Sequence, residues 1–222
     1  MFKSVRLGRD VGDQTFPARP GVCLGIANRP GFWMTHKSAI DLLKIAAYCV
    51  YLVAWVVFAV GAVVGALPRL RRRVAGTITA PQLIGTLLQI LAAFAVTRSM
   101  GAGPLRPRTF ELAGALVLAP LGAALFLWAL RSVPRDADGD TLVTGGAYSW
   151  LRNPLYLAFL AMLVATGFLI SGGVKLILPV LLYLAGSELR IASEERELSE
   201  KFPEGYALYR SRTRWRYLPG LR

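Results

Sequence analysis

Two polar, charged segments of this sequence carry the residue types that could do chemistry. The first, DTLVTGGAYSWLRNPLY, extends from Asp140 to Tyr156, and the second, RIASEERELSEKF, extends from Arg190 to Phe202. A long apolar stretch separates them, so that they bracket a predicted apolar hairpin. In a membrane protein, ionisable groups next to such a hairpin indicate a site that is fed from the aqueous side.

The second segment places an arginine and two glutamates on a predicted helix. Arg190 and Glu194 are four positions apart and therefore share one helix face, while Glu195 lies about 100° around the axis. Such a run of charges could be only a solvated helix face. Arg190, however, directly follows an apolar helix, where an ionisable group needs a partner or a function.

The first segment has a simple structural interpretation of its own. Asn153 is a good N-cap residue, and Pro154 suits the first turn of a helix, so the segment could be only a capped helix start. Gly145 and Gly146 permit backbone turns that other residues resist.

The composition indicates one integral membrane domain. The 222 residues are 55% hydrophobic, with a mean hydropathy of +0.47, which is too apolar for an ordinary soluble domain. The net charge of +13 comes from arginines at the ends of apolar runs, which favours membrane loops over nucleic-acid binding. Two cysteines, Cys23 and Cys49, and one histidine, His36, provide neither a disulfide framework nor a metal site.

The apolar runs predict an all-α fold with about five transmembrane helices. Uncharged stretches occupy residues 45–67, 79–97 and 112–130, and two shorter runs after Arg152 are joined by Ser171, Gly172 and Gly173. We expect the last two helices to form a short helical hairpin, whose second arm continues past Gly186 and is followed by a C-terminal cytosolic helix. Residues 1–38 are expected to be an irregular tail, and residues 39–222 a single transmembrane domain.

The helix count predicts that the tail and the C-terminus lie on opposite sides of the bilayer. The side with Arg69–Arg73, the Asp140 loop and the C-terminal segment has more basic residues, so we expect it to be cytoplasmic. The basic residues of the tail argue against this orientation. After Glu204, arginines alternate with aromatic residues, a pattern typical of an interfacial segment on anionic lipid rather than of a nucleic-acid site.

The two polar segments, together with the ending GYALYRSRTRWRYLP, resemble the isoprenylcysteine carboxyl methyltransferase family and the related phospholipid methyltransferases. That family has a His-x-Leu-Val, Gly-x-Tyr, Arg-His-Pro-x-Tyr block, then Arg-x3-Glu-Glu and a Phe-Gly-x2-Tyr-x2-Tyr close. The resemblance covers residues 140–219. It implies a membrane-embedded methyltransferase that takes S-adenosylmethionine from the cytosol and a lipophilic or lipidated acceptor from the bilayer, with isoprenylcysteine-type carboxylate methylation as the expected reaction.

The resemblance also implies roles for individual residues, within a cofactor-binding part that covers residues 136–219. Glu194 would hold the polar end of the cofactor and Arg190 would face the reacting group of the substrate, and these two are the candidate catalytic residues. The candidate cofactor-binding residues are Asp140, Thr141, Leu142, Val143, Tyr148, Arg152, Asn153, Pro154, Leu155, Tyr156, Glu194 and Glu195.

Two departures from the family pattern bear on the substrate. Asp140 and Asn153 stand where the family has histidines, so no motif histidine can act as a general base. A carboxylate or thiolate acceptor needs no base, because it already carries the attacking electron pair. A phospholipid amine would first have to lose a proton, and Glu194 or Glu195 would be the nearest base.

Two other classes of protein remain open at this point. Intramembrane sterol and steroid reductases, which use NADPH, have a related C-terminal end, although this chain lacks the extra spans expected of the sterol enzymes. A non-enzymatic membrane protein could carry the charged segments as interfacial anchors only. A Rossmann-type methyltransferase is excluded, because no glycine-rich loop follows a predicted strand.

Overall fold

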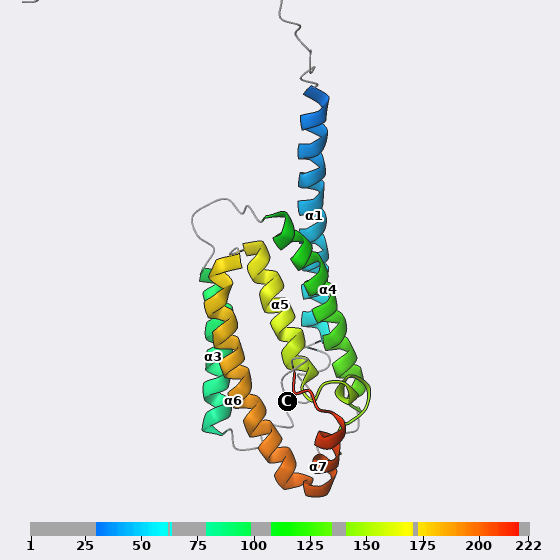
Figure 1. The fold of residues 1–222 in the computed structure, drawn as a ribbon, viewed down its shortest axis with the longest axis vertical. Helices are drawn as coiled ribbons and strands as arrows, with labels where there is room; N and C mark the ends of the chain where they lie inside the picture. Colours follow the sequence, from blue (N-terminus) through cyan, green and yellow to red (C-terminus); the bar gives the residue numbers. More distant parts are fainter. Residues whose placement is uncertain are drawn as a thin grey trace, which may run out of the picture.

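The computed structural model describes residues 30–61, 63, 79–98, 108–134, 141–170 and 173–217, and for residues 30–40, 173 and 174 it describes the backbone only. Within these ranges the fold is all-helical and has no strand, as predicted. The α-helices are α1 (Pro30–Gly61), α3 (Ala80–Arg98), α4 (Thr109–Ser132), α5 (Pro154–Ile170), α6 (Ile177–Lys201) and α7 (Pro203–Arg212) (Figure 1). Short 3-10 helices cover Gly146–Ser149 and Gly173–Leu176.

The first helix begins earlier than the sequence predicted. The expected span began at residue 45, after an irregular tail of residues 1–38, but α1 already starts at Pro30. Absence of charge marks the part of a helix that can lie in lipid, whereas the helix itself can continue into water. The ion pair of 3.1 Å between Lys44 and Asp41, one turn apart, belongs to such an extension. Residues 1–29 and 64–67 lie outside the described part of the chain.

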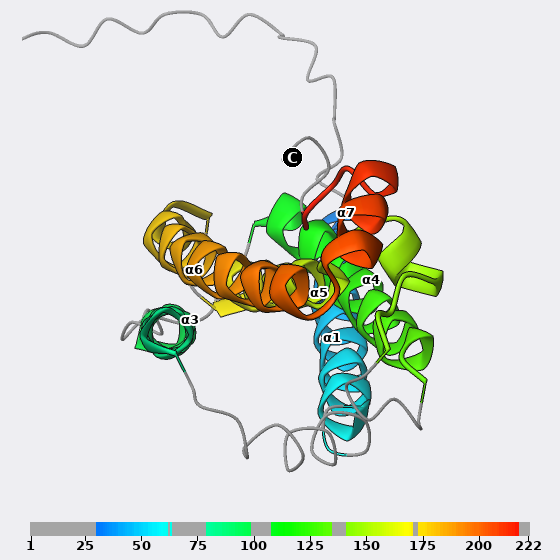
Figure 2. The same ribbon diagram turned by 90° about the horizontal axis from the view of Figure 1, so that it is seen from below.

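The helices form two packed groups. Helices α4 and α1 pack together, and α5 packs mainly against α4, whereas α6 packs mainly against α3. Seen along the bundle, α3 and α6 lie side by side and α1, α4 and α5 form the other group (Figure 2). Helices α5 and α6 follow each other in the chain, as expected for the two arms of the predicted hairpin. They pack mainly against other helices, however, α5 against α4 and α6 against α3. As predicted, α6 continues past Gly186 into the charged segment.

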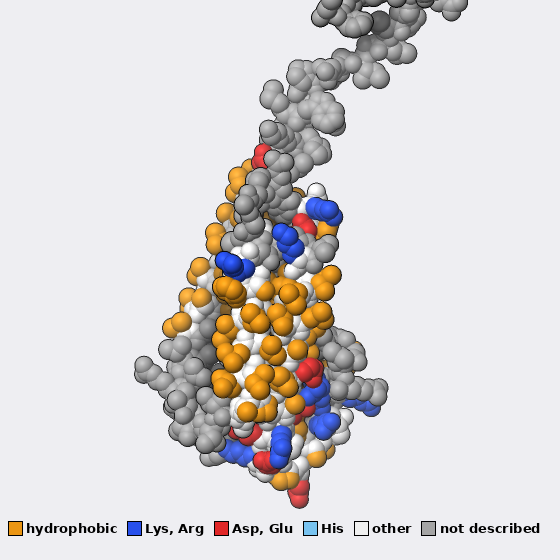
Figure 3. All heavy atoms as spheres, turned by 90° about the vertical axis from the view of Figure 1, so that its left-hand side faces the viewer, with side chains coloured by type: hydrophobic (Ala, Val, Ile, Leu, Met, Phe, Trp, Pro, Cys, Tyr) orange, Lys and Arg blue, Asp and Glu red, His pale blue; other side chains and the backbone are white. Residues whose placement is uncertain are grey.

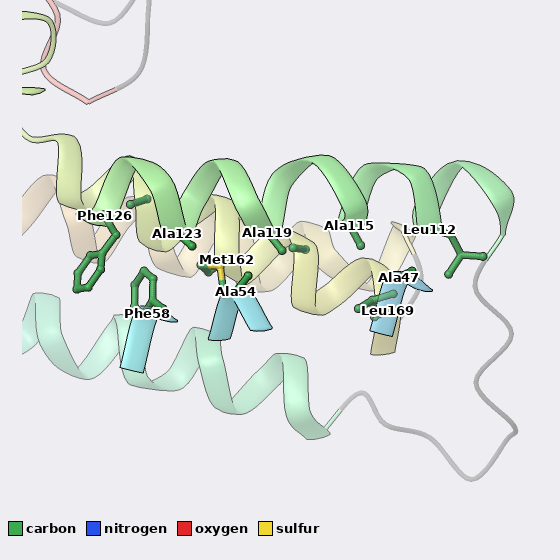
Figure 4. Packing of buried hydrophobic residues seen from close by; sticks show 12 residues of the cluster. Ala47, Ala54, Phe58, Leu112, Ala115, Ala119, Ala123, Phe126, Met162 and Leu169 are labelled. Atoms are coloured by element: carbon green, nitrogen blue, oxygen red, sulfur yellow. The ribbon is translucent and has the colours of Figure 1, made fainter. Parts of the chain in front are cut away.

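Small residues bring the helices of the first group close together. Ala115, Ala119 and Ala123 recur at every fourth position of α4 and are fully or almost fully buried, with Met162 of α5 beside them (Figure 4). At one end of this core the rings of Phe58 and Phe126 stack with centroids 4.0 Å apart. Small residues at such positions allow close backbone approach, which is the usual basis of helix association in a bilayer.

The second group is held by a contact between two glycines. A Cβ atom on Gly85 of α3 would lie 2.6 Å from the carbonyl oxygen of Gly186, and one on Gly186 would lie 2.6 Å from the carbonyl oxygen of Gly85. Any side chain at either position would push α3 and α6 apart. This approach sets the distance across which polar groups of α3 reach α6.

On the face of the bundle shown in Figure 3, apolar side chains lie between two charged ends. Helix α1 from Asp41 to Gly61, α3 and α4 are long and apolar enough to cross a membrane, and α5 is a shorter apolar helix of 17 residues. Helix α1 begins at one end of the bundle and α7 lies at the other (Figure 1).

Candidate active site

The candidate site lies at the α7 end of the bundle, where α6 leaves its apolar half. Arg190 and Glu194 are one turn apart on α6, and their side chains form an ion pair of 3.5 Å between Nη2 and Oε1. The Tyr156 hydroxyl of α5 donates a 2.9 Å hydrogen bond to the same Glu194 oxygen. The Arg190 guanidinium also lies over the Tyr156 ring, 5.6 Å from its centroid. We call these three residues the Arg190 cluster.

Backbone contacts fix Tyr156 in this cluster. The Tyr183 hydroxyl of α6 donates a hydrogen bond of 2.8 Å to the carbonyl oxygen of Tyr156. Both tyrosines are buried, so the hydrogen bond ties the start of α5 to the middle of α6. Three residues that the sequence placed in the site, Tyr156, Arg190 and Glu194, are therefore in direct contact.

The sequence did not identify the contribution of α3. Arg190 Nη1 donates a 3.1 Å hydrogen bond to Oε1 of Gln89, and Nε2 of Gln89 donates one of 3.0 Å to the Ser187 hydroxyl. The available signal was a side-chain amide inside an apolar span, which in lipid has to find a polar partner.

Glu195 belongs to a second group of charges, although it is adjacent to Glu194 in sequence. Arg152 and Glu195 form an ion pair of 3.2 Å, with side chains only 3% and 13% exposed. Arg216 completes the group, since its two terminal nitrogens contact Glu195 at 3.1 Å and Glu188 at 2.7 Å. The two neighbouring glutamates thus take part in different polar networks.

Arg216 belongs to a C-terminal strap, residues 213–217, that lies against the start of α5. The backbone N–H of Arg152 donates to the carbonyl of Trp215 at 2.9 Å, and that of Asn153 donates to the carbonyl of Arg216 at 2.7 Å. Tyr217 is 1% exposed. The backbone of both motif residues, Arg152 and Asn153, is therefore paired with the strap, and Arg152 is held by its ion pair as well.

Burial and the charged group shift the ionisation of nearby residues. Burial and the neighbouring Glu195 carboxylate raise the pKa of Tyr206 to about 12. Partial burial lowers the pKa of Arg216, but Glu195 and Glu188 outweigh that effect and raise it above the usual arginine value. Both side chains therefore keep their protons at neutral pH.

Three of the predicted cofactor residues line an open hollow beside these groups. Thr141, Leu142 and Val143, with Thr144 and Gly145, face the end of α4 across a space of about 480 Å³. A second hollow of about 360 Å³ lies between Leu142 and residues 202–205. Pockets of this size suit small molecules. Asp140 and Arg69–Arg73 lie outside the described residues.

The first polar segment, residues 140–156, also contains buried donors that lack a hydrogen-bond partner within the described chain. These are Nη2 of Arg152 and Nδ2 of Asn153. A buried donor without a partner is costly, so these atoms are available to donate to a polar ligand or to water. A carboxylate or ribose, as in S-adenosylmethionine, has the acceptor oxygens that these donors need. Tyr148 lies nearby in the chain, and its carbonyl accepts a 2.7 Å hydrogen bond from the Tyr209 hydroxyl.

Fold and site together define a multi-pass α-helical membrane protein whose polar residues gather at one end of the bundle. Residues 112–200 match the family model of the isoprenylcysteine carboxyl methyltransferase (ICMT) family. The match confirms, for this part of the chain, the family that the polar segments resemble, and that family is one of methyltransferases. Gln89 and the strap lie outside the matched residues. No curated protein matched the sequence.

Proposed function

We propose that this protein is an S-adenosylmethionine-dependent methyltransferase that methylates a lipophilic carboxylate taken from the bilayer. The observation that carries the proposal is the Arg190 cluster, which lies in the family-matched region where an apolar bundle meets a charged end. We further propose that this end, with the strap and α7, faces the cytoplasm, where the cofactor is available.

The cofactor would lie between the hollow at Thr141–Val143 and the start of α5. Its polar end would be held by Glu194 and by the unpartnered donors of Arg152 and Asn153. Asp140, Tyr148, Pro154, Leu155, Tyr156 and Glu195 complete the proposed cofactor site. When bound, the sulfonium supplies an electrophilic methyl group.

Arg190 would bind the acceptor. Its side chain is one-third exposed, and its Nε is a buried donor without a hydrogen-bond partner in the described chain. A carboxylate can accept two parallel hydrogen bonds from a guanidinium, which fixes its orientation as well as its position. Alignment of acceptor and donor groups in a pocket with little water can supply much of the rate acceleration.

The ion pairs of the two glutamates favour a carboxylate over an amine. Glu194 is engaged by Tyr156 and Arg190, and Glu195 is engaged by Arg152 and Arg216. Each carboxylate would have to give up one of these contacts to hydrogen-bond a lipid amine. A lipid amine would need such a base, whereas a carboxylate reacts without proton transfer.

The cofactor is tested by calorimetry on the detergent-purified protein. Wild type should bind S-adenosylmethionine, and Glu194→Gln should weaken binding at least tenfold. Glu200→Gln is the matched control, because Glu200 lies on the same helix, pairs with Arg196, and both side chains are mostly exposed, at 68% and 82%. Absence of binding to wild type would reject the proposal, and binding of NADPH instead would favour a membrane reductase.

The acceptor is tested by transfer of a labelled methyl group to three lipophilic probes. These are N-acetyl-S-farnesyl-cysteine for a carboxylate, phosphatidylethanolamine for an amine, and a long-chain thiol. A methyl ester releases volatile methanol in mild alkali, whereas N-methyl and S-methyl products do not. Transfer to the amine or thiol alone would contradict the carboxylate assignment and leave the cofactor assignment intact.

A further inference from the structure

We propose that Gln89 of α3 is a positioning residue that holds the Arg190 guanidinium in the orientation in which it binds the acceptor. The inference rests on the proposed function and adds to it a residue from a helix outside the family-matched region. The side-chain hydrogen bonds of Gln89 go to Arg190 and Ser187. Neither of them reaches the proposed cofactor site or the start of α5.

The orientation of the Gln89 amide is determined by its neighbours. The Ser187 hydroxyl donates its proton to the carbonyl of Tyr183 at 2.8 Å, so toward Gln89 it can only accept. The Gln89 NH2 group must therefore point to Ser187, at 3.0 Å, and its oxygen must point to Arg190. The result is a one-way chain of hydrogen bonds from Arg190 through Gln89 and Ser187 to the backbone of α6.

Helix α3 also determines where the stem of Arg190 lies. A Cβ atom on Gly85 would come within 2.6 Å of Cγ of Arg190. Because Gly85 has no side chain, the aliphatic part of Arg190 can lie against α3 at this position. Gln89, one turn further along α3, accepts the hydrogen bond from the guanidinium. One face of α3 therefore contacts Arg190 at both ends of its side chain.

This contact competes with the ion pair inside α6. Arg190 and Glu194 are 3.5 Å apart, which is long for an arginine–carboxylate contact, while Gln89 draws the other terminal nitrogen away at 3.1 Å. Without Gln89, no hydrogen bond within the described part of the chain opposes a rotation of the guanidinium toward Glu194 to form a two-point pair. That rotation would occupy the nitrogen edge that an acceptor carboxylate needs.

The test compares Gln89→Met with Gln89→Glu and Thr86→Val. Methionine keeps the volume but loses both hydrogen bonds, whereas glutamate keeps an acceptor oxygen for Arg190. Thr86→Val is the matched control, since the Thr86 hydroxyl donates only to the carbonyl of Gln82 in its own helix. The readouts are the calorimetric Kd of S-adenosylmethionine, the Kd of N-acetyl-S-farnesyl-cysteine in the presence of S-adenosylhomocysteine, and Tm in detergent.

We expect Gln89→Met to weaken probe binding about tenfold and to change the Kd of S-adenosylmethionine less than twofold. Gln89→Glu should stay within about threefold of wild type for the probe, and Thr86→Val should match wild type. In an Arg190→Ala background, Gln89→Met should cause no further loss of probe binding, because its effect acts through Arg190.

The possible failures are distinguishable. If wild type binds both ligands and Gln89→Met keeps its probe affinity, or loses affinity equally with and without Arg190, the role of Gln89 is rejected and the methyltransferase proposal stands. If wild type binds no S-adenosylmethionine, the proposed function is rejected. If wild type binds the cofactor but not the probe, both the carboxylate acceptor and the role of Gln89 are rejected.

Discussion

The Tyr156 hydroxyl donates a 2.9 Å hydrogen bond to Oε1 of Glu194, and this bond joins the two polar segments of the sequence directly. Arg190 contacts the same oxygen from one turn away on α6. The charged half of α6 therefore has two different faces. Arg196 and Glu200 form a mostly exposed pair, as a solvated face would, whereas Glu194 is held between two helices.

Tyr156→Phe should weaken S-adenosylmethionine binding about fivefold, because it removes one hydrogen bond to Glu194, worth about 1 kcal/mol, and keeps the ring beneath Arg190. Calorimetry measures the change. Tyr51→Phe is the matched control, since the Tyr51 hydroxyl donates to Thr166 between α1 and α5, away from the site. Equal losses in the two variants would mean that the effect of Tyr156 is only structural.

Arg216→Gln should detach the strap from α6. It removes the ion pairs to Glu188 and Glu195 and leaves a mostly buried Glu195 with one cation fewer, at a cost of about 1–3 kcal/mol. We expect a lower Tm in detergent and faster proteolysis of the C-terminal segment that follows Tyr209. Arg214→Gln, at an exposed strap position, serves as the control and should leave both unchanged. An unaltered Tm for Arg216→Gln would show that the backbone pairing alone holds the strap.

Gly85→Ala should destabilise the contact between α3 and α6. The added Cβ would lie 2.6 Å from both the Gly186 carbonyl oxygen and Cγ of Arg190, so the helices would have to separate. We expect a lower Tm and weaker probe binding together. Gly145→Ala tests the same substitution where a Cβ meets nothing within 4 Å, and its Tm should match wild type. If Gly85→Ala behaves in the same way, the glycine contact is not needed.

The raised pKa of Tyr206 predicts a loss of stability in alkali. In the unfolded chain this tyrosine loses its proton near pH 10, whereas in the fold its pKa is about 12. Its contribution is complete below pH 10 and disappears as the pH rises toward 12, because the unfolded state releases its proton first. The fall of Tm between pH 10 and 12 should be smaller for Tyr206→Phe. An identical fall would mean that other groups dominate the alkaline transition.

The sequence alone determined the fold class and the side-by-side placement of Arg190 and Glu194. These features follow from local rules, because apolar length predicts spans and helix periodicity predicts which residues share a face. The sequence also indicated that the residues around Asn153 and Pro154 begin a helix, as α5 does at Pro154.

Only the tertiary structure decided which helix meets which. Absence of charge could not locate the start of α1, because a helix continues into water beyond its apolar part. Nothing local to Gln89 or Arg216 indicates that one contacts Arg190 and the other Glu195. The separation of Glu194 and Glu195 into two networks likewise depends on the packing of α3, α5 and the strap around α6. Contacts between residues far apart in sequence depend on helix packing, and here the contact between Gly85 and Gly186 sets that packing for α3 and α6.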